Sequence, residues 1–159
     1  MKKPNEKTNV MRILDQKKVA YSAHDYTHAA TTNGEEVAAV LGQDPNRVFK
    51  TLVTVGASKQ YHVFMVPVCR ELHLKKAAAA VGEKSIAMIP QKDLLPLTGY
   101  IHGGCSPIGM KKQFKTTADA TAQAFETVIF SAGKIGYQVE VAPADLQRVI
   151  PLNFADITE

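Results

Sequence analysis

The sequence predicts an α/β domain of the α+β type, with a mixed, largely antiparallel sheet or partial barrel flanked by helices. Two pairs of segments rich in β-branched and aromatic residues are each separated by a short polar turn that contains glycine, a pattern typical of hairpins. Amphipathic stretches with helix start and stop signals lie before, between and after these pairs. The chain has 159 residues, which is enough for one hydrophobic core, so residues 1–159 are expected to form a single domain.

The chain opens with a predicted helix and a predicted strand. Val10, Ile13 and Leu14 recur at helical spacing, and polar residues that suit a first turn precede them. This pattern predicts a helix over residues 5–18. Residues 19–26 then alternate loosely between apolar and polar side chains, which indicates a short strand.

A second helix has clear start and stop signals. Asn33 can cap its N-terminus, with Glu36 three residues later in the position of a capping box, and Gly42 ends it. The next two segments, residues 48–55 and 61–68, read VFKTLVTV and YHVFMVPV on either side of the turn GASKQ. They predict an antiparallel hairpin.

The second half of the chain continues the alternation of helices and strands. A helix is predicted over residues 72–81, which contain four consecutive alanines and are followed by a glycine. The later predicted elements are, in order, a strand over 85–89, a helical turn over 90–95, an extended segment over 100–102, a hairpin of strands over 125–131 and 137–141, and a helix over 143–150.

Composition excludes several classes of protein. The chain is 45% hydrophobic and 21% charged, as in ordinary globular proteins and unlike disordered or collagenous chains. It has no run of about eighteen apolar residues and no apolar segment after its basic start, so neither a membrane span nor a secretory signal is expected. Two cysteines are too few for a disulfide scaffold, and the cytoplasm is the expected location. The net charge of +4 is compatible with a polyanionic partner.

Lys50 is unusual because it interrupts a strand that is otherwise nearly all apolar. The alternation of a strand places it on one face with Val48, Leu52 and Thr54. One interpretation is an edge-strand lysine whose stem covers apolar surface while its ammonium stays in water. The other is a fixed cation for a carbonyl oxygen, a carboxylate or a phosphate. Spacing alone favours the first, because buried charges are rare unless they are paired.

The segment 103–109 reads GGCSPIG and combines three glycines with Ser106 and Pro107. Such a loop can direct main-chain N–H groups at an anion or a developing oxyanion, or it can be a tight structural turn. It matches neither GxxxxGK[ST] nor GxGxxG, so no nucleotide cofactor is expected.

A cysteine nucleophile or a metal site finds little support in the sequence. Cys105 lies in the glycine-rich segment, but no spacing ties a histidine to it, and a thiol is more often a packing residue. His24 and His28 lie four residues apart at the end of a predicted strand, without an HExxH or CxxC pattern. GxSxG is absent as well. We therefore expect no metal and no cofactor.

Four runs along the chain, taken in order, carry a family resemblance. They are DPNRVFKTL at 44–52, LKKAA at 74–78, TGY followed by GGCSPIG within 98–109, and SAGKIG at 131–136. Together they resemble the YbaK family, the free-standing homologues of the editing insertion of prolyl-tRNA synthetase. The resemblance spans essentially the whole chain. It implies a compact mixed-sheet domain that hydrolyses mischarged aminoacyl-tRNA, with Cys-tRNA(Pro) deacylases as the nearest relatives.

The resemblance also implies roles for individual residues. Lys50 matches the essential lysine of the family. The residues that match the pocket are Tyr26, Gly103, Gly104, Ser106, Pro107, Ser131 and Gly133. The sequence departs from the family pattern at three positions: Cys105, where an aliphatic residue is usual; Gln138, where relatives often carry a small or acidic residue; and Asn33, where they can carry an aromatic one.

The implied chemistry needs no protein nucleophile, because an aminoacyl ester is already activated and mainly requires positioning and charge stabilisation. For a cysteinyl substrate, the family implies that the substrate's own thiol attacks its carbonyl and forms a cyclic thioester. The implied partners are the 3′ end of the tRNA and prolyl-tRNA synthetase. The alternatives left open are action on Ala-tRNA or another small misacylated amino acid, and a non-catalytic module that binds a nucleotide or small ligand.

Overall fold

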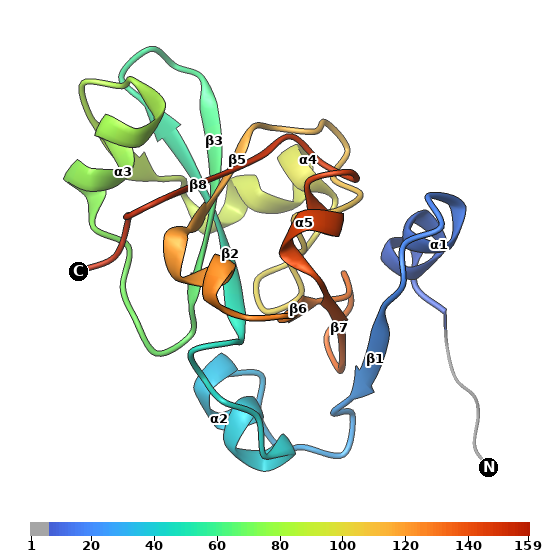
Figure 1. Cartoon of the computed structure of the whole chain (residues 1–159). Coiled ribbons are helices and arrows are strands. Elements are labelled where there is room, and N and C mark those ends of the chain that lie inside the picture. The colour runs from blue at the N-terminus through green and yellow to red at the C-terminus, as the bar shows by residue number, and fades with distance from the viewer. Residues whose placement is uncertain (1–6) are drawn as a thin grey trace.

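Two β-sheets form the centre of the protein, with helices around them (Figure 1). The computed structural model describes residues 7–159. The helices are α1 (Asn9–Gln16), α2 (Gly34–Leu41), α3 (Leu74–Val81), α4 (Leu94–Thr98) and α5 (Pro143–Leu146), with 3-10 turns η1 (Gln91–Asp93) and η2 (Ala120–Ala124). The strands are β1 (Ser22–Asp25), β2 (Phe49–Gly56), β3 (Tyr61–Pro67), β4 (Ile86–Met88), β5 (Thr116–Asp119), β6 (Val128–Ser131), β7 (Tyr137–Val141) and β8 (Leu152–Ala155).

The smaller sheet is antiparallel and the larger one is mixed. The smaller sheet has the order β1-β7-β6, and the larger has the order β4-β2-β3-β5-β8. In the larger sheet β2 pairs antiparallel with β3 and β4, whereas β3, β5 and β8 are parallel. Within residues 7–159, one isolated bridge between Val48 and Ile129 joins the two sheets. The predicted mixed, largely antiparallel α+β fold is confirmed, although the strands divide into two sheets.

The first two helices begin at capping side chains, although Glu36 accepts from the Thr31 hydroxyl and does not close the expected capping box with the Asn33 N–H. The Thr8 side chain caps α1, which is shorter than the predicted helix, and residues 5 and 6 of that prediction lie outside the described part of the chain. The Asn33 side chain accepts a hydrogen bond from the Glu36 N–H at 3.1 Å at the start of α2. Gly42 ends α2 with φ of +69°, a conformation that glycine adopts without steric cost.

Two strands had no counterpart among the predicted elements. β5 and β8 pair in parallel with distant parts of the chain, so their formation depends on tertiary contacts more than on local pattern. The predicted helix over 143–150 ends at Leu146, and the chain then turns into β8. Residues 100–102 lie outside the strands.

The largest cluster of the hydrophobic core combines residues of α1 with residues of both sheets. This cluster includes Leu14 of α1, Phe49 of β2, Phe130 of β6 and Val139 of β7, all of them buried. Burial of such side chains supplies about 1.5–3 kcal/mol each and holds the two sheets together. Among the described residues no helix is long and apolar enough to cross a membrane.

Candidate active site

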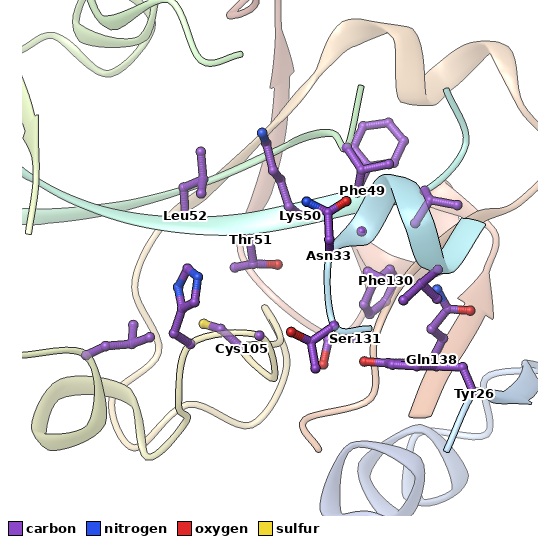
Figure 2. Close-up of a pocket in the computed structure, with 18 residues that line it drawn as sticks. Tyr26, Asn33, Phe49, Lys50, Thr51, Leu52, Cys105, Phe130, Ser131 and Gln138 are labelled. Atoms are coloured by element: carbon purple, nitrogen blue, oxygen red, sulfur yellow. The ribbon is translucent and has the colours of Figure 1, made fainter. Parts of the chain in front are cut away.

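A cavity of about 280 Å³ lies where the two sheets meet (Figure 2). Its walls come from β2, from β6 and β7 of the smaller sheet, from the start of α2 and from the loop that follows α4. Four residues singled out from the sequence line it together: Tyr26, Lys50, Gly103 and Ser131. Residues from position 26 to position 131 of the chain therefore meet in one site.

The other four predicted pocket residues are not part of the cavity lining, and their polar groups form hydrogen bonds with nearby residues of the chain. The Gly104 N–H donates to the Ile101 carbonyl at 2.9 Å, so it closes a turn instead of facing the cavity. Ser106 is fully buried, and its Oγ accepts from the Ile108 N–H at 3.3 Å. The Pro107 carbonyl accepts from Gln113 Nε2 at 3.3 Å.

Gly133, the last of these four, donates its N–H to Ser131 Oγ at 3.1 Å. This hydrogen bond fixes the rotamer of a side chain that does line the cavity. The Ser131 hydroxyl can still donate its own hydrogen to a bound oxygen. Gly133 therefore acts on the cavity through Ser131.

Lys50 lies at the rim of the cavity. Its Nζ is 3.2 Å from Glu71 Oε2, and the two side chains are 31% and 79% exposed. Figure 2 shows the ammonium on the side of β2 opposite to the neighbouring Thr51 side chain. Because exposed ion pairs contribute little stability, and because a lysine stem has four rotatable bonds, the ammonium can leave Glu71 for an anionic group at the rim.

Gly103 contributes main-chain atoms to the cavity, because it has no side chain. Its φ is +91°, and a Cβ atom there would lie 3.6 Å from Ile135 Cδ1. This backbone conformation strains any other residue, so a side chain is excluded from that wall of the cavity.

Tyr26 and Gln138 form the far end of the cavity, and both are at most 5% exposed. The Tyr26 N–H donates to the Gly136 carbonyl at 2.7 Å, which ties the end of β1 to the turn before β7. Gln138 Oε1 accepts from Gln43 Nε2 at 2.9 Å. The amide group of Gln138, one of the three residues that depart from the family pattern, is thereby held in one orientation.

Cys105 lines the cavity but is not suited to act as a nucleophile. Burial raises the pKa of its thiol to about 12, so the thiol is protonated at neutral pH. The nearby Tyr100 hydroxyl donates to the Ile108 carbonyl, and burial raises the pKa of this phenol to about 12 as well. Both side chains act as packing residues, Cys105 within the glycine-rich segment and Tyr100 just before it.

Within residues 7–159, no group of three or more histidine, cysteine, aspartate or glutamate side chains is arranged to hold a metal ion. His24 instead bonds to Glu140, with Nε2 2.8 Å from Oε1. His62 bonds to Glu83 in the same way at 2.7 Å. These histidines pair with carboxylates away from the cavity.

Comparison with known families agrees with this geometry. The profile described as the aminoacyl-tRNA editing domain matches residues 27–149. The chain belongs to this family. The matched range contains the described cavity residues with the exception of Tyr26, so the editing domain and the cavity occupy the same part of the chain. The resemblance drawn from the sequence motifs is confirmed.

Three similar proteins give the family match more detail. The chain is 46% identical over 158 residues to an Enterococcus faecalis protein, EbsC, proposed to be a Cys-tRNA(Pro)/Cys-tRNA(Cys) deacylase; the match covers 99% of this chain and 96% of EbsC. It is 30% identical over 103 residues to a proline–tRNA ligase of Thermosipho melanesiensis, covering 65% of this chain and 18% of the ligase. A solved structure of a protein proposed to be a trans-editing enzyme for prolyl tRNA synthetase matches with a TM-score of 0.80, 23% identity and 94% coverage of each chain, which shows the shared fold.

The editing-domain cavity is also lined by polar side chains that the sequence analysis did not single out, namely Thr32, Thr51 and His102. Thr51 lines the cavity, and its Oγ1 is buried without a hydrogen-bond partner among the described residues. The pattern VFKTL gave no signal for it, because threonine is common in strands. The only sequence feature that could have indicated Thr51 is its position directly after the candidate lysine, Lys50.

Proposed function

We propose that the protein is an aminoacyl-tRNA deacylase that acts in trans and removes cysteine mischarged onto tRNA(Pro). The observation that carries the proposal is a cavity bounded by Lys50, Gly103 and Ser131 within a chain of the editing-domain family. The 46% identical EbsC is named for the same substrate class. The bond that breaks is the ester between cysteine and the terminal ribose of the tRNA.

The size of the cavity sets how the tRNA is bound. A volume of about 280 Å³ has room for an aminoacyl group and part of a nucleoside, but not for a duplex. We therefore propose that the tRNA enters by its single-stranded 3′ end. The net charge of +4 favours phosphate contacts, which carry no sequence information. Selection of tRNA(Pro) is accordingly assigned to a partner, prolyl-tRNA synthetase.

The proposed chemistry relies on positioning and charge stabilisation. The Lys50 ammonium stabilises negative charge that develops on the acyl group, and main-chain atoms of Gly103 and the Ser131 hydroxyl hold the group in place. No protein thiolate is required, and with its pKa near 12 the Cys105 thiol is a poor source of one. No resident cofactor or metal takes part in this scheme.

Selectivity for cysteine follows if the substrate supplies the nucleophile. The substrate sulfur attacks its own carbonyl carbon, the carbon–oxygen bond to the ribose breaks, and the thiol proton ends on the ribose oxygen. The product is a cyclic thioester, which water then opens to free cysteine. Pocket contacts alone discriminate between side chains that differ by one methylene by only about 1–3 kcal/mol. Serine is rejected for a chemical reason instead, because it has no thiol to attack the carbonyl carbon.

The experiment is a deacylation assay with Cys-tRNA(Pro), Ala-tRNA(Pro) and Ser-tRNA(Pro). The wild type is expected to release cysteine fastest, and Lys50→Ala to lose activity by about a hundredfold or more, as for other charge-stabilising groups. Lys75→Ala, which removes an exposed charge on α3, is the matched control and should retain activity. Equal activity of Lys50→Ala and the wild type would remove Lys50 from the mechanism.

The same assay separates the remaining functions. Faster release of alanine than of cysteine would reassign the substrate, and saturable binding of charged tRNA without ester cleavage would indicate a binding module. Addition of prolyl-tRNA synthetase should raise the preference for tRNA(Pro) over tRNA(Cys) charged with cysteine. If the purified protein alone made this distinction strongly, the assigned role of the partner would be wrong.

A further inference from the structure

The edge of β2 that faces away from β3 is only partly paired. Near its start, the Ile129 N–H of β6 donates to the Arg47 carbonyl at 2.9 Å, and near its middle the Ile89 N–H donates to the Val53 carbonyl at 3.3 Å. Between these two contacts no other strand of the described chain pairs with this edge. Residues 49–52 line the cavity there, so the cavity occupies a gap in the sheet.

The direction of the main-chain groups in this gap follows from the register. In an antiparallel pair, successive residues direct their N–H and C=O groups to alternate edges of the strand. The Val68 N–H donates to the Val48 carbonyl at 2.8 Å, so Val48 and the even-numbered residues that follow it face β3. Thr51 therefore directs its N–H and C=O to the open edge, which is the edge used by the Arg47 and Val53 carbonyls. Its N–H points into the gap.

The side chain of Thr51 adds a second polar group at the same place. Its Oγ1 is buried and has no hydrogen-bond partner among residues 7–159. Figure 2 shows this side chain directed from β2 toward the side of the cavity that holds Cys105 and Ser131. A buried hydroxyl without a partner has lost its hydrogen bonds to water and is costly to keep. We therefore expect the Thr51 hydroxyl to form a hydrogen bond with a bound ligand.

We infer that Thr51 is a catalytic residue of the proposed deacylation, an inference that rests on the proposed function. Its N–H and hydroxyl donate hydrogen bonds to the carbonyl oxygen of the aminoacyl group. As the substrate sulfur attacks the carbonyl carbon, the π electrons of the C=O bond move onto this oxygen. The two donors are held by the strand and shielded from water, which is the arrangement that stabilises a developing oxyanion. Lys50 directs its side chain to the opposite side of β2 and pairs with Glu71, so its ammonium contributes charge only after it leaves Glu71 and does not supply these directed bonds.

The test compares Thr51→Val with Thr51→Ser. Valine has nearly the shape of threonine and suits a strand, so it removes the hydroxyl without a cavity. Thr51→Val is expected to lower kcat for Cys-tRNA by about tenfold to a hundredfold with little change in KM, because the lost bond is made in the transition state. It should also raise the melting temperature, since an unpaired buried hydroxyl is replaced by a methyl group. Thr51→Ser keeps the hydroxyl and should keep most of kcat.

The outcomes distinguish this inference from the proposed function. If the wild type releases cysteine and Thr51→Val retains its kcat, the inference is overturned and the proposed function stands. If Thr51→Val loses melting temperature together with activity, the hydroxyl has a structural partner and the inference is overturned. If the wild type releases no cysteine and no other amino acid, both fail.

Discussion

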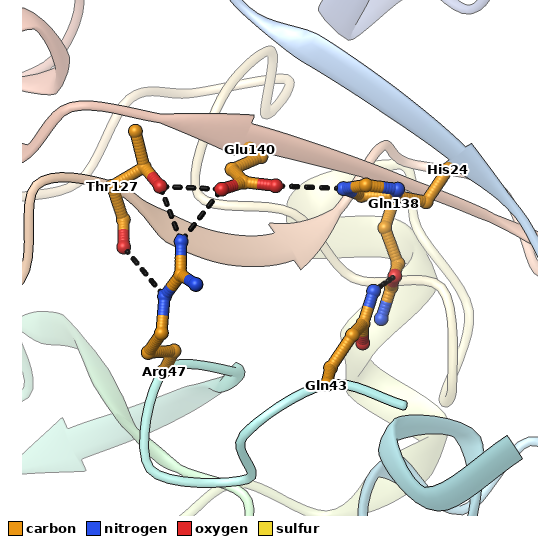
Figure 3. Close-up of polar contacts among 6 residues, drawn as sticks. All are labelled: His24, Gln43, Arg47, Thr127, Gln138 and Glu140. Carbon is orange, nitrogen blue, oxygen red and sulfur yellow. Dashed lines mark hydrogen bonds and ion pairs between the residues drawn. The ribbon is translucent and has the colours of Figure 1, made fainter. Parts of the chain in front are cut away.

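Arg47 Nη2 lies 2.6 Å from Glu140 Oε2 and joins the segment before β2 to β7 of the other sheet (Figure 3). The same carboxylate accepts from the Thr127 hydroxyl and bonds to His24 Nε2. Arg47 precedes Lys50 by three residues, and Glu140 follows Gln138 by two. This ion pair therefore fixes two walls of the cavity relative to each other.

Replacement of Arg47 tests this link between the sheets. Arg47→Met keeps most of the apolar stem and is expected to lower the free energy of unfolding by about 1–3 kcal/mol, since it removes hydrogen bonds between charged groups that are only partly exposed. Activity should fall as well, because β2 is no longer anchored to β7. Urea unfolding and the deacylation assay measure the two effects. The control is Arg148→Met, which breaks a more exposed pair with Asp145 and should change stability by less than about 0.5 kcal/mol.

Acid should destabilise the protein through two carboxylates. Burial raises the pKa of Glu140, but hydrogen bonds from Thr127 and His24 and the charge of Arg47 outweigh it, and the net pKa is below the usual 4.5. Hydrogen bonds from Ser58 and His62 likewise lower the pKa of Glu83 below 4.5. A group whose pKa is lower in the folded state adds stability above its unfolded pKa and loses it as pH falls through its folded pKa.

The free energy of unfolding should therefore decrease as pH drops below about 4.5, with a slope that follows from linkage. Glu140→Gln and Glu83→Gln should each make this decrease shallower. Glu126→Gln, at an exposed position, is the control for the substitution itself. Urea titrations between pH 3 and pH 7 measure how the free energy of unfolding changes with pH. If this slope were the same in both test variants as in the wild type, the assigned pKa shifts would be contradicted.

The elements that could be predicted are those whose signals are local. The β2–β3 hairpin and the capped helix α2 follow from alternation, a turn and an Asn33 cap within a few residues. The parallel strands β5 and β8 could not be predicted in this way, because each is stabilised by a partner more than thirty residues away. Short parallel strands carry no hairpin turn to mark them.

The site shows the same division between local and tertiary signals. Lys50 and Gly103 were identified because a charge in an apolar strand and a glycine-rich loop are visible in the sequence, and both line the cavity. Whether they act on substrate stays a prediction. Thr51 was missed because the burial of its hydroxyl depends on the gap between β4 and β6, which only the assembled sheets create. The Arg47–Glu140 ion pair joins residues 93 positions apart in the chain, so no local sequence pattern could predict it.

The two cysteines should differ sharply in reactivity. Cys69 is exposed, whereas Cys105 is buried with a pKa near 12. Iodoacetamide at pH 8 should therefore alkylate Cys69 in the folded protein and reach Cys105 only after denaturation, because the thiolate is the reactive form. Mass spectrometry of tryptic peptides locates the label. Cys105→Ala should retain deacylase activity, and its complete loss in a folded variant would restore Cys105 as a candidate nucleophile.

Gly133 and Gly82 offer a matched pair that separates backbone strain from packing. Both have positive φ, +89° and +75°, but a Cβ at Gly133 would lie 2.9 Å from Tyr100 Cε1 and 3.0 Å from Val10 Cγ2, whereas one at Gly82 meets nothing within 4 Å. Gly82→Ala is expected to cost about 1 kcal/mol from conformation alone. Gly133→Ala should cost about 2–4 kcal/mol, because overpacking adds to the strain.

Urea unfolding measures both costs, and equal values would show that the contacts at Gly133 relax freely. The deacylation assay adds a second distinction between the two glycines. The Gly133 N–H holds Ser131 Oγ in the cavity wall, and the crowded Cβ of Gly133→Ala should shift this main chain, so activity should fall even where the protein remains folded. Gly82 lies at the end of α3 and is not part of the cavity lining, so Gly82→Ala should leave activity unchanged at the same temperature.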